Sequence, residues 1–258
     1  MNKDQNTHIL NINQLYPENN SISRPVSKGL IHDVYIVETK YKDKIVCRFS
    51  THKTAKHNLY VSRLVNSNGI QVPDGCLYKF DEEYCETYPF IKGNTLFERI
   101  NQGISEEKLD NIYRQIFDIS YTISKIPYNF DSDLYVPVTA KIAKKFFKAF
   151  NVSPVALCHT DLNAKNIVLD DQDNVSALLD LDAVYPESMA FALINLAREA
   201  HLFGYDIKKM APLCYKNGIE PKVFGIKAQA QLYSALKQIG IFLLPEHVLK
   251  QILTLNIK

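Results

Sequence analysis

The pattern of hydrophobic and polar positions changes near Gly93. Before it, apolar and aromatic residues gather in short runs separated by turn-forming residues, as in β-strands. After it, apolar residues recur at three- and four-residue steps, which indicates amphipathic helices. The pattern predicts an α+β chain with two parts, a small sheet over residues 1–91 and a larger, mainly helical region over 92–258.

Two β-hairpins with one helix between them are predicted in the first part. The hairpins have KYKD and DEE as turns, and their strands cover 34–39 with 44–50 and 76–80 with 84–91. In the intervening segment, Leu59, Leu64 and Val65 follow helical spacing, and Gly69 stands where a C-cap would lie.

The clearest helix of the second part runs from Ser105 to about Lys125. Its apolar residues recur every three or four positions, and Ser105 is a fitting N-cap. Further helices are predicted at 139–150, 187–203, 206–216, 222–238 and 245–256.

Composition restricts the class of protein. With 258 residues, 46% of them hydrophobic, the chain can bury the core of one large domain or of two lobes. A net charge of +2 gives no field that favours nucleic acid or a membrane surface. The N-terminus lacks the apolar core of a signal peptide, no apolar run is long enough for a membrane span, and the five cysteines are scattered. We expect a cytoplasmic protein with reduced thiols, whose oligomeric state the sequence leaves open.

The stretch CHTDLNAKNIVLDDQDNVSALLDLD, residues 158–182, concentrates polar groups at both ends of an apolar hairpin. Its strands are predicted at 166–169 and 175–179, with DDQDN as the turn. A register centred on Asp173 places Asn166 opposite Asp180, where Cβ atoms are about 5 Å apart. An amide oxygen and a carboxylate could then share a Mg²⁺ ion together with phosphate oxygens and water.

Asp161 lies in the loop that enters this hairpin, where its carboxylate could accept a proton from a hydroxyl nucleophile. His159, two residues earlier, is expected to tie the loop to neighbouring backbone carbonyls. The alternative is that these Asp and Asn residues only cap turns, as they commonly do in loops.

The spacing H-x-D-x-x-x-x-N followed by an Asp after a short hairpin is the phosphoryl-transfer arrangement of kinases. In detail, HTDLNAKNIVLD followed by LLDLD resembles the aminoglycoside phosphotransferase and choline kinase superfamily. Over roughly residues 20–205, the resemblance implies a bilobal protein-kinase-like fold, with a small antiparallel sheet and one helix in the nucleotide-binding N-lobe. It implies a mainly helical C-lobe with the catalytic loop and acceptor site, and ATP and Mg²⁺ as cofactors.

The resemblance also suggests nucleotide contacts in the first lobe. Ser27 and the backbone at Gly29 correspond to the phosphate-covering loop, although a plain hairpin turn explains Gly29 equally well. Arg48 corresponds to the basic residue that holds phosphates; the alternative is an edge-strand arginine facing solvent. Tyr88 and Phe90 correspond to the strand whose backbone meets adenine, unless these aromatic residues belong to the core.

Two positions depart from the pattern of the superfamily. The helix between the hairpins should offer a Glu to Arg48, yet no acidic residue occurs between Asp43 and Asp74, and Asn58 stands near the expected place. An amide could hydrogen-bond Arg48 but supplies no charge. Ala192 stands where an Asp is common after LDLD. For Asp182 two roles remain open: a second metal contact, or a hydrogen bond that supports the catalytic loop.

The expected activity is transfer of the γ-phosphate of ATP to a hydroxyl of a small molecule, either an antibiotic or a choline-like or sugar-like metabolite. Residues 204–258 contain eight Lys and three acidic residues, a balance unfavourable for a polycationic aminoglycoside. The alternative is a non-catalytic nucleotide-binding pseudokinase, motivated by the missing Glu and a glycine-poor loop. The presence of Asp161, Asn166 and Asp180 together favours the enzyme.

Overall fold

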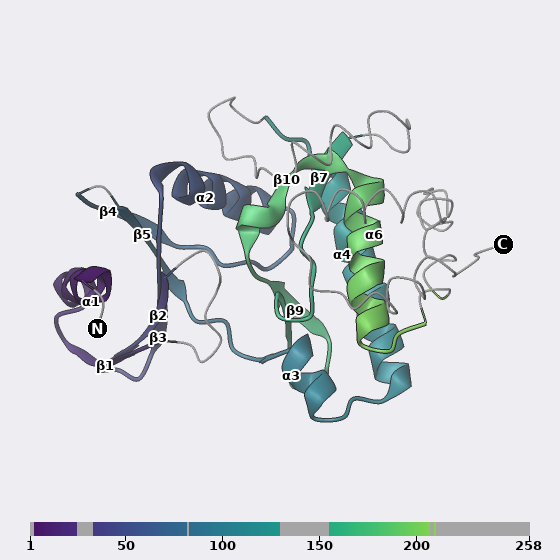
Figure 1. The fold of residues 1–258 in the computed structure, drawn as a ribbon, viewed down its shortest axis with the longest axis horizontal. Coiled ribbons are helices and arrows are strands. Elements are labelled where there is room, and N and C mark those ends of the chain that lie inside the picture. Colours follow the sequence, from purple (N-terminus) through teal and green to yellow (C-terminus); the bar gives the residue numbers. More distant parts are fainter. Residues whose placement is uncertain (1–2, 25–32, 82, 130–154, 207–208, 210–258) are drawn as a thin grey trace. The chain divides into compact units, whose positions relative to one another are not determined.

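The computed structural model describes residues 3–24, 33–81, 83–129, 155–206 and 209 (Figure 1). They divide into two compact units, one ending at Lys92 and the other beginning at Gly93. In this described part of the chain, no helix is both long and apolar enough to cross a membrane. The helices predicted at 139–150, 222–238 and 245–256, and most of that at 206–216, lie outside the described residues.

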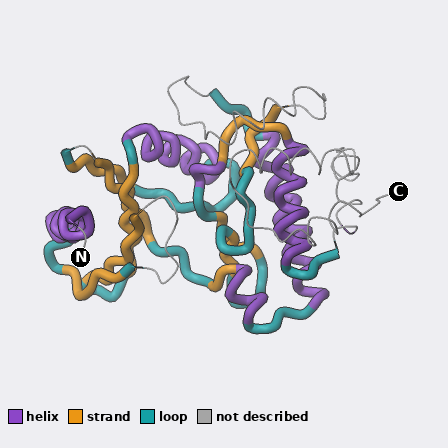
Figure 2. The backbone as a smooth tube through the Cα atoms, in the orientation of Figure 1, coloured by secondary structure: helices purple, strands orange, loops and turns teal. Residues whose placement is uncertain are grey.

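The first unit is built on a five-stranded antiparallel sheet, whose strands are drawn in orange in Figure 2. The strand order is β1-β2-β3-β5-β4. All four predicted strands are confirmed, and a short strand at the N-terminal side was not predicted. The bounds are Asn19–Ser23 for β1, Asp33–Thr39 for β2, Lys44–Ser50 for β3, Cys76–Phe80 for β4 and Glu83–Pro89 for β5. Strand β3 is therefore the central strand of the sheet.

Two helices cover opposite faces of this sheet (Figure 1). Helix α1, Lys3–Leu15, places Ile12 in a core with residues of β2, β3 and β5. Its His8 stacks on Phe49 at 4.0 Å between ring centroids, and Nε2 of His8 lies 2.9 Å from Oε2 of Glu83. The sequence predicted one helix in this unit and missed α1, because its polar composition gives little amphipathic pattern and its stability comes from packing on the sheet.

Helix α2, His52–Asn66, covers the other face. It begins seven residues before Leu59, the first of the apolar positions that predicted it, because the side chain of Thr51 caps the helix by accepting the N–H of Thr54. The C-cap is Ser67, not Gly69 as predicted. Gly69 follows with a φ of 80° in the turn after the helix.

The second unit combines small sheets with helices. Strand β7 pairs with β10, and β8 lies between β6 and β9 in an antiparallel sheet. Helices α4 and α6 both contact β7. The bounds are Asn94–Thr95 for β6, Leu96–Asn101 for α3, Glu106–Lys125 for α4, Val155–His159 for β7, Ile167–Leu169 for β8, Val175–Leu178 for β9, Leu181–Ala183 for the 3₁₀ helix η1, Val184–Ser188 for β10 and Met189–Leu202 for α6.

The predicted elements of this unit are largely confirmed. Ser105 caps α4 by accepting the N–H of Lys108, and α6 lies within the helix predicted at 187–203. The β8–β9 hairpin forms across the predicted turn. At the entrance to the unit, Gly93 has a φ of 136°, and a Cβ at this position would lie 2.2 Å from the carbonyl oxygen of Leu169. Only glycine allows this close approach.

The turn of the β8–β9 hairpin is fastened to two helices through Asp173. This residue has a φ of 64°, and its carboxylate is buried. Arg99 of α3 donates Nε and Nη2 to its two oxygens at 2.5 and 2.9 Å, and Nζ of Lys108 on α4 lies 2.5 Å from Oδ2. The sequence predicted only a turn-forming role for Asp173. In the structure, Asp173 also links the hairpin that follows the predicted catalytic loop to α3 and α4.

Candidate active site

His159 holds the two ends of the candidate site together. It is the buried last residue of β7, and its Nε2–H donates to the carbonyl of Leu179 at 2.9 Å. Its Nδ1 accepts the backbone N–H of Asp161 at 3.4 Å, so the proton lies on Nε2. Burial lowers the pKa of His159, which keeps the imidazole neutral. The predicted role is confirmed: the ring ties the Asp161 loop to a backbone carbonyl at the end of β9.

Two amides hold the carboxylate of Asp161. Its Oδ2 accepts Nδ2 of Asn163 at 3.0 Å and Nδ2 of Asn166 at 3.3 Å. The same Nδ2 of Asn166 lies 2.9 Å from the carbonyl oxygen of Asp161. Since both amides reach one carboxylate oxygen, the other, Oδ1, is the atom that could accept a proton from a hydroxyl.

Asn163 is a site residue that the sequence analysis missed. Its own Oδ1 accepts the backbone N–H of Lys165 at 2.9 Å, which closes a local Asx turn and orients Nδ2 toward Asp161. The signal that could have identified it is its position two residues after the candidate base. An Asn there can close an Asx turn and direct its amide back to the carboxylate.

The predicted register of the hairpin is wrong by one residue. Asn166 lies opposite Leu179, whose N–H donates to the carbonyl of Asn166 at 2.8 Å, and Asp180 is one position further along. The cause is the turn, which is centred on Gln172, so that Leu169 pairs with Val175, two positions from its predicted partner. A register shift between Val168 and Leu169 leaves one extra residue on β9 and recovers one of these two positions. The predicted hairpin, centred on Asp173, had neither this turn centre nor the bulge.

Asp180 stands in a left-handed backbone conformation, with φ 61° and ψ 63°, directly before η1. This conformation costs a non-glycine residue roughly 1 kcal/mol, although Asp tolerates it better than most. The residue is exposed, and Asp182 lies partly buried within η1. Such strained positions cluster at functional sites, and a strained, exposed carboxylate next to the His159 contact is a candidate metal ligand.

The donor types at this site fit Mg²⁺. Nδ2 of Asn166 is directed to Asp161, so the amide oxygen of Asn166 and the carboxylate of Asp180 are the oxygens that could face a cation. In the described ranges, no three His, Cys, Asp or Glu side chains are grouped so that they could hold a metal. Mg²⁺ does not require such a cage, because it commonly binds one or two protein oxygens together with phosphate oxygens and water.

In the first unit, Arg48 has an acidic partner that the sequence analysis judged to be missing. Arg48 is 7% exposed on the central strand β3, so the alternative of a solvent-facing edge-strand arginine is wrong. Its Nη1 lies 3.6 Å from Oε1 of Glu86, directly opposite on β5. The carboxylate therefore comes from the neighbouring strand and not from helix α2.

Asn58 lies beside this pair but does not hydrogen-bond Arg48. Its Nδ2 donates to both carboxylate oxygens of Glu86, at 3.2 and 3.1 Å. Its Oδ1, the atom that could accept from a guanidinium, makes no hydrogen bond to any described residue. The expected Asn58–Arg48 contact is thus replaced by an Asn58–Glu86 contact.

The remaining predicted nucleotide contacts are located only in part. Ser27 and Gly29 lie outside the described residues. Tyr88 is partly buried on β5, opposite Val46, and Phe90 follows the strand with an exposed ring. The N–H of Phe90 already donates to the carbonyl of Lys44 at 2.9 Å, so this backbone donor is not available to the adenine ring of a nucleotide.

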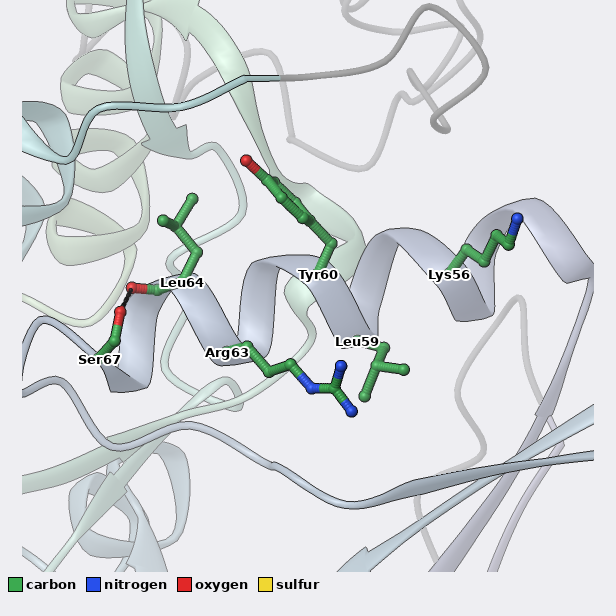
Figure 3. Close-up of a pocket in the computed structure, with 6 residues that line it drawn as sticks. All are labelled: Lys56, Leu59, Tyr60, Arg63, Leu64 and Ser67. Atoms are coloured by element: carbon green, nitrogen blue, oxygen red, sulfur yellow. Dashed lines mark hydrogen bonds between the residues drawn. The ribbon is translucent and has the colours of Figure 1, made fainter.

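A hollow of about 420 Å³ lies along α2 and shares no residue with the predicted site (Figure 3). Figure 3 shows its lining side chains projecting from one helix, with Oγ of Ser67 bonded to the carbonyl of Leu64. The lining residues are Lys56, Leu59, Tyr60, Arg63, Leu64 and Ser67. They include no carboxylate that could act as a base or bind Mg²⁺.

Comparison with known proteins identifies the fold. No protein-family model and no curated protein matches the sequence. Among solved structures, amicoumacin kinase hAmiN in complex with AMP-PNP, Ca²⁺ and Ami matches with a TM-score of 0.67 and 11% identity, over 96% of this chain and 93% of that chain. ADP-bound aminoglycoside phosphotransferase APH(2'')-Ib matches with a TM-score of 0.61 and 14% identity, over 98% and 97%.

A thermostable mutant of aminoglycoside phosphotransferase APH(4)-Ia matches similarly, with a TM-score of 0.63, 12% identity and 94% coverage of each chain. The chain therefore has the α+β, protein-kinase-like fold of these phosphotransferases, as its motifs predicted. At 11% to 14% identity the likeness establishes the fold, and the activity has to be argued from the site.

Proposed function

We propose that the protein is an ATP- and Mg²⁺-dependent phosphotransferase that moves the γ-phosphate to a hydroxyl of a small molecule. The observation that supports the proposal is the Asp161 loop, in which two amides hold one carboxylate oxygen, Oδ2. We assign the other oxygen, Oδ1, to the substrate hydroxyl. This loop occurs in a chain with the fold of small-molecule kinases whose structures were solved with ADP or AMP-PNP.

In the proposed mechanism, Asp161 orients the acceptor hydroxyl and accepts its proton as the oxygen attacks the γ-phosphorus, while the bond from that phosphorus to the β,γ-bridging oxygen breaks and ADP leaves. Arg48 binds nucleotide phosphates through N–H donors other than those facing Glu86. Asn166 and Asp180 would hold Mg²⁺, which offsets negative charge on the phosphates when bound. Asp182 would either add a metal contact or brace the loop, and we assign Ser27, Gly29, Tyr88 and Phe90 to the nucleotide.

The acceptor is proposed only as a hydroxylated small molecule. By their names, the proteins of this fold include an amicoumacin kinase and an aminoglycoside phosphotransferase in complex with gentamicin. The lysine-rich C-terminal residues 204–258 make a polycationic acceptor less favourable. The pseudokinase alternative loses its main support, because Arg48 has a carboxylate partner in Glu86.

A screen for nucleotide-dependent turnover tests the proposal. The protein would be incubated with Mg²⁺, with ATP or GTP, and with hydroxylated antibiotics, amino alcohols and sugars, and ADP or GDP release would be measured. We expect release above the Asp161→Asn control with at least one acceptor class. Tight nucleotide binding without turnover on any acceptor would support the pseudokinase, and absence of nucleotide binding would exclude both.

A further inference from the structure

The pairing of Arg48 with Glu86 is built into the central sheet of the first unit. The two residues are register partners on β3 and β5, with the charged atoms 3.6 Å apart. Opposed residues in an antiparallel ladder have Cβ atoms about 5 Å apart, and the ladder maintains that separation. Both side chains are largely buried, at 9% and 12% exposure. The backbone of the sheet therefore sets the distance between the guanidinium and the carboxylate.

Two neutral side chains hold the carboxylate of Glu86 in place. Oγ of Ser50 donates to its Oε1 at 3.0 Å, and Nδ2 of Asn58 donates to both oxygens. Ser50 lies two residues after Arg48 on β3 and so shares its face of the sheet. Because a serine and an amide are uncharged, they fix the carboxylate without neutralising it, and its charge remains available to Arg48.

We infer that Glu86 is a positioning residue that orients Arg48 toward nucleotide phosphates, an inference that rests on the proposed function. In protein kinases the corresponding acid lies on a helix, so helix movement can break the pair. In this chain, α2 supplies the amide of Asn58, and the acid belongs to the sheet. Displacement of α2 would remove the two hydrogen bonds from Asn58 and hold the carboxylate less firmly, while the pairing of β3 with β5 keeps Glu86 opposite Arg48.

Calorimetric titration of the full chain with Mg²⁺-ATP and with adenosine tests the inference. The variants are Arg48→Ala, Glu86→Gln and the double mutant, with Glu83→Gln as the matched control. Glu83 is also on β5, but its partner is His8 of α1. Glu86→Gln should lower ATP affinity roughly tenfold, since a charge-assisted contact is lost, while adenosine affinity stays unchanged. The double mutant should be little worse than Arg48→Ala, because Glu86 acts through Arg48.

Equal losses for ATP and adenosine, or fully additive losses in the double mutant, would assign Glu86 a merely structural role and overturn the inference. If Glu86→Gln does not fold, Asn58→Ala carries the same test, with an expected loss of ATP affinity of a few fold and none of adenosine affinity; unchanged ATP affinity would overturn the inference. Failure of the wild-type protein to bind ATP or GTP would instead overturn the proposed function, and the inference with it.

Discussion

Nδ2 of Asn163 lies 3.0 Å from Oδ2 of Asp161, and this amide is the closest side-chain partner of the proposed base. The hydrogen bond fixes the carboxylate rotamer, since Asn163 is itself held through the N–H of Lys165. A base that must meet a hydroxyl at hydrogen-bond distance depends on such fixation. Asn163 is therefore expected to act on turnover through Asp161.

The variant Asn163→Ala should lower kcat about fivefold, the equivalent of one hydrogen bond, and leave the ATP affinity unchanged. Steady-state kinetics on an identified acceptor and calorimetry with ATP measure the two effects. Asn174→Ala removes an exposed amide from the nearby hairpin turn and serves as the control. A loss of nucleotide affinity equal to the loss of kcat would show that Asn163 supports the fold of the loop in general.

The proposed cation site predicts a change in metal dependence. Asn166→Ala and Asp180→Asn each remove or neutralise an oxygen donor, so ATP binding should require more Mg²⁺. Asn is preferred to Ala at position 180 because it tolerates the left-handed backbone there. The combined effect should be less than additive, since both residues serve one ion. ATP titrations at several Mg²⁺ concentrations measure this, and unchanged metal dependence in both variants would contradict the site.

Asp173 should stabilise the second unit in a pH-dependent way. Hydrogen bonds from Arg99 and then Lys108 lower the pKa of Asp173 to about 2, below the value of about 3.9 expected for an unfolded chain. A lowered pKa means that the ionised form stabilises the fold above pH of about 4, and that this contribution is lost as the pH falls toward 2.

Accordingly, Asp173→Asn should reduce the free energy of unfolding by about 1–3 kcal/mol at neutral pH, because a buried carboxylate with two cationic partners is lost. The difference between wild type and variant should shrink between pH 4 and pH 2. Denaturant titrations at these values test it, with Asp171→Asn, an exposed residue of the same turn, as control. A pH-independent difference would point to packing as the cause.

Local patterns were sufficient to predict the elements that carry the site. Short β-rich runs identified β2 to β5, and the motif around Asp161 identified the loop and its hairpin. The register of that hairpin could not be predicted, because DDQDN does not determine which residue is the centre of the turn, and the bulge near Leu169 depends on how β9 pairs along its length. As a result, the predicted neighbour of Asn166 was Asp180, whereas the observed neighbour is Leu179.

Contacts between distant residues were missed for a different reason. The partner of Arg48 is 38 positions away on another strand, and alternation alone does not determine which strands pair. The expected partner was therefore a Glu on the intervening helix, where Asn58 stands instead. Helix α1 was missed because its contacts with the sheet, rather than its own pattern, stabilise it.

The most direct test of the proposed phosphotransferase activity is a paired measurement on Asp161→Asn, comparing phosphoryl transfer with ATP affinity. Asn keeps the size of the side chain but cannot accept the proton of the hydroxyl. We predict that turnover on an identified acceptor falls by about a hundredfold or more, while calorimetry shows ATP affinity close to that of the wild type. Turnover by Asp161→Asn at the wild-type rate would contradict the account, since the base would then not be Asp161.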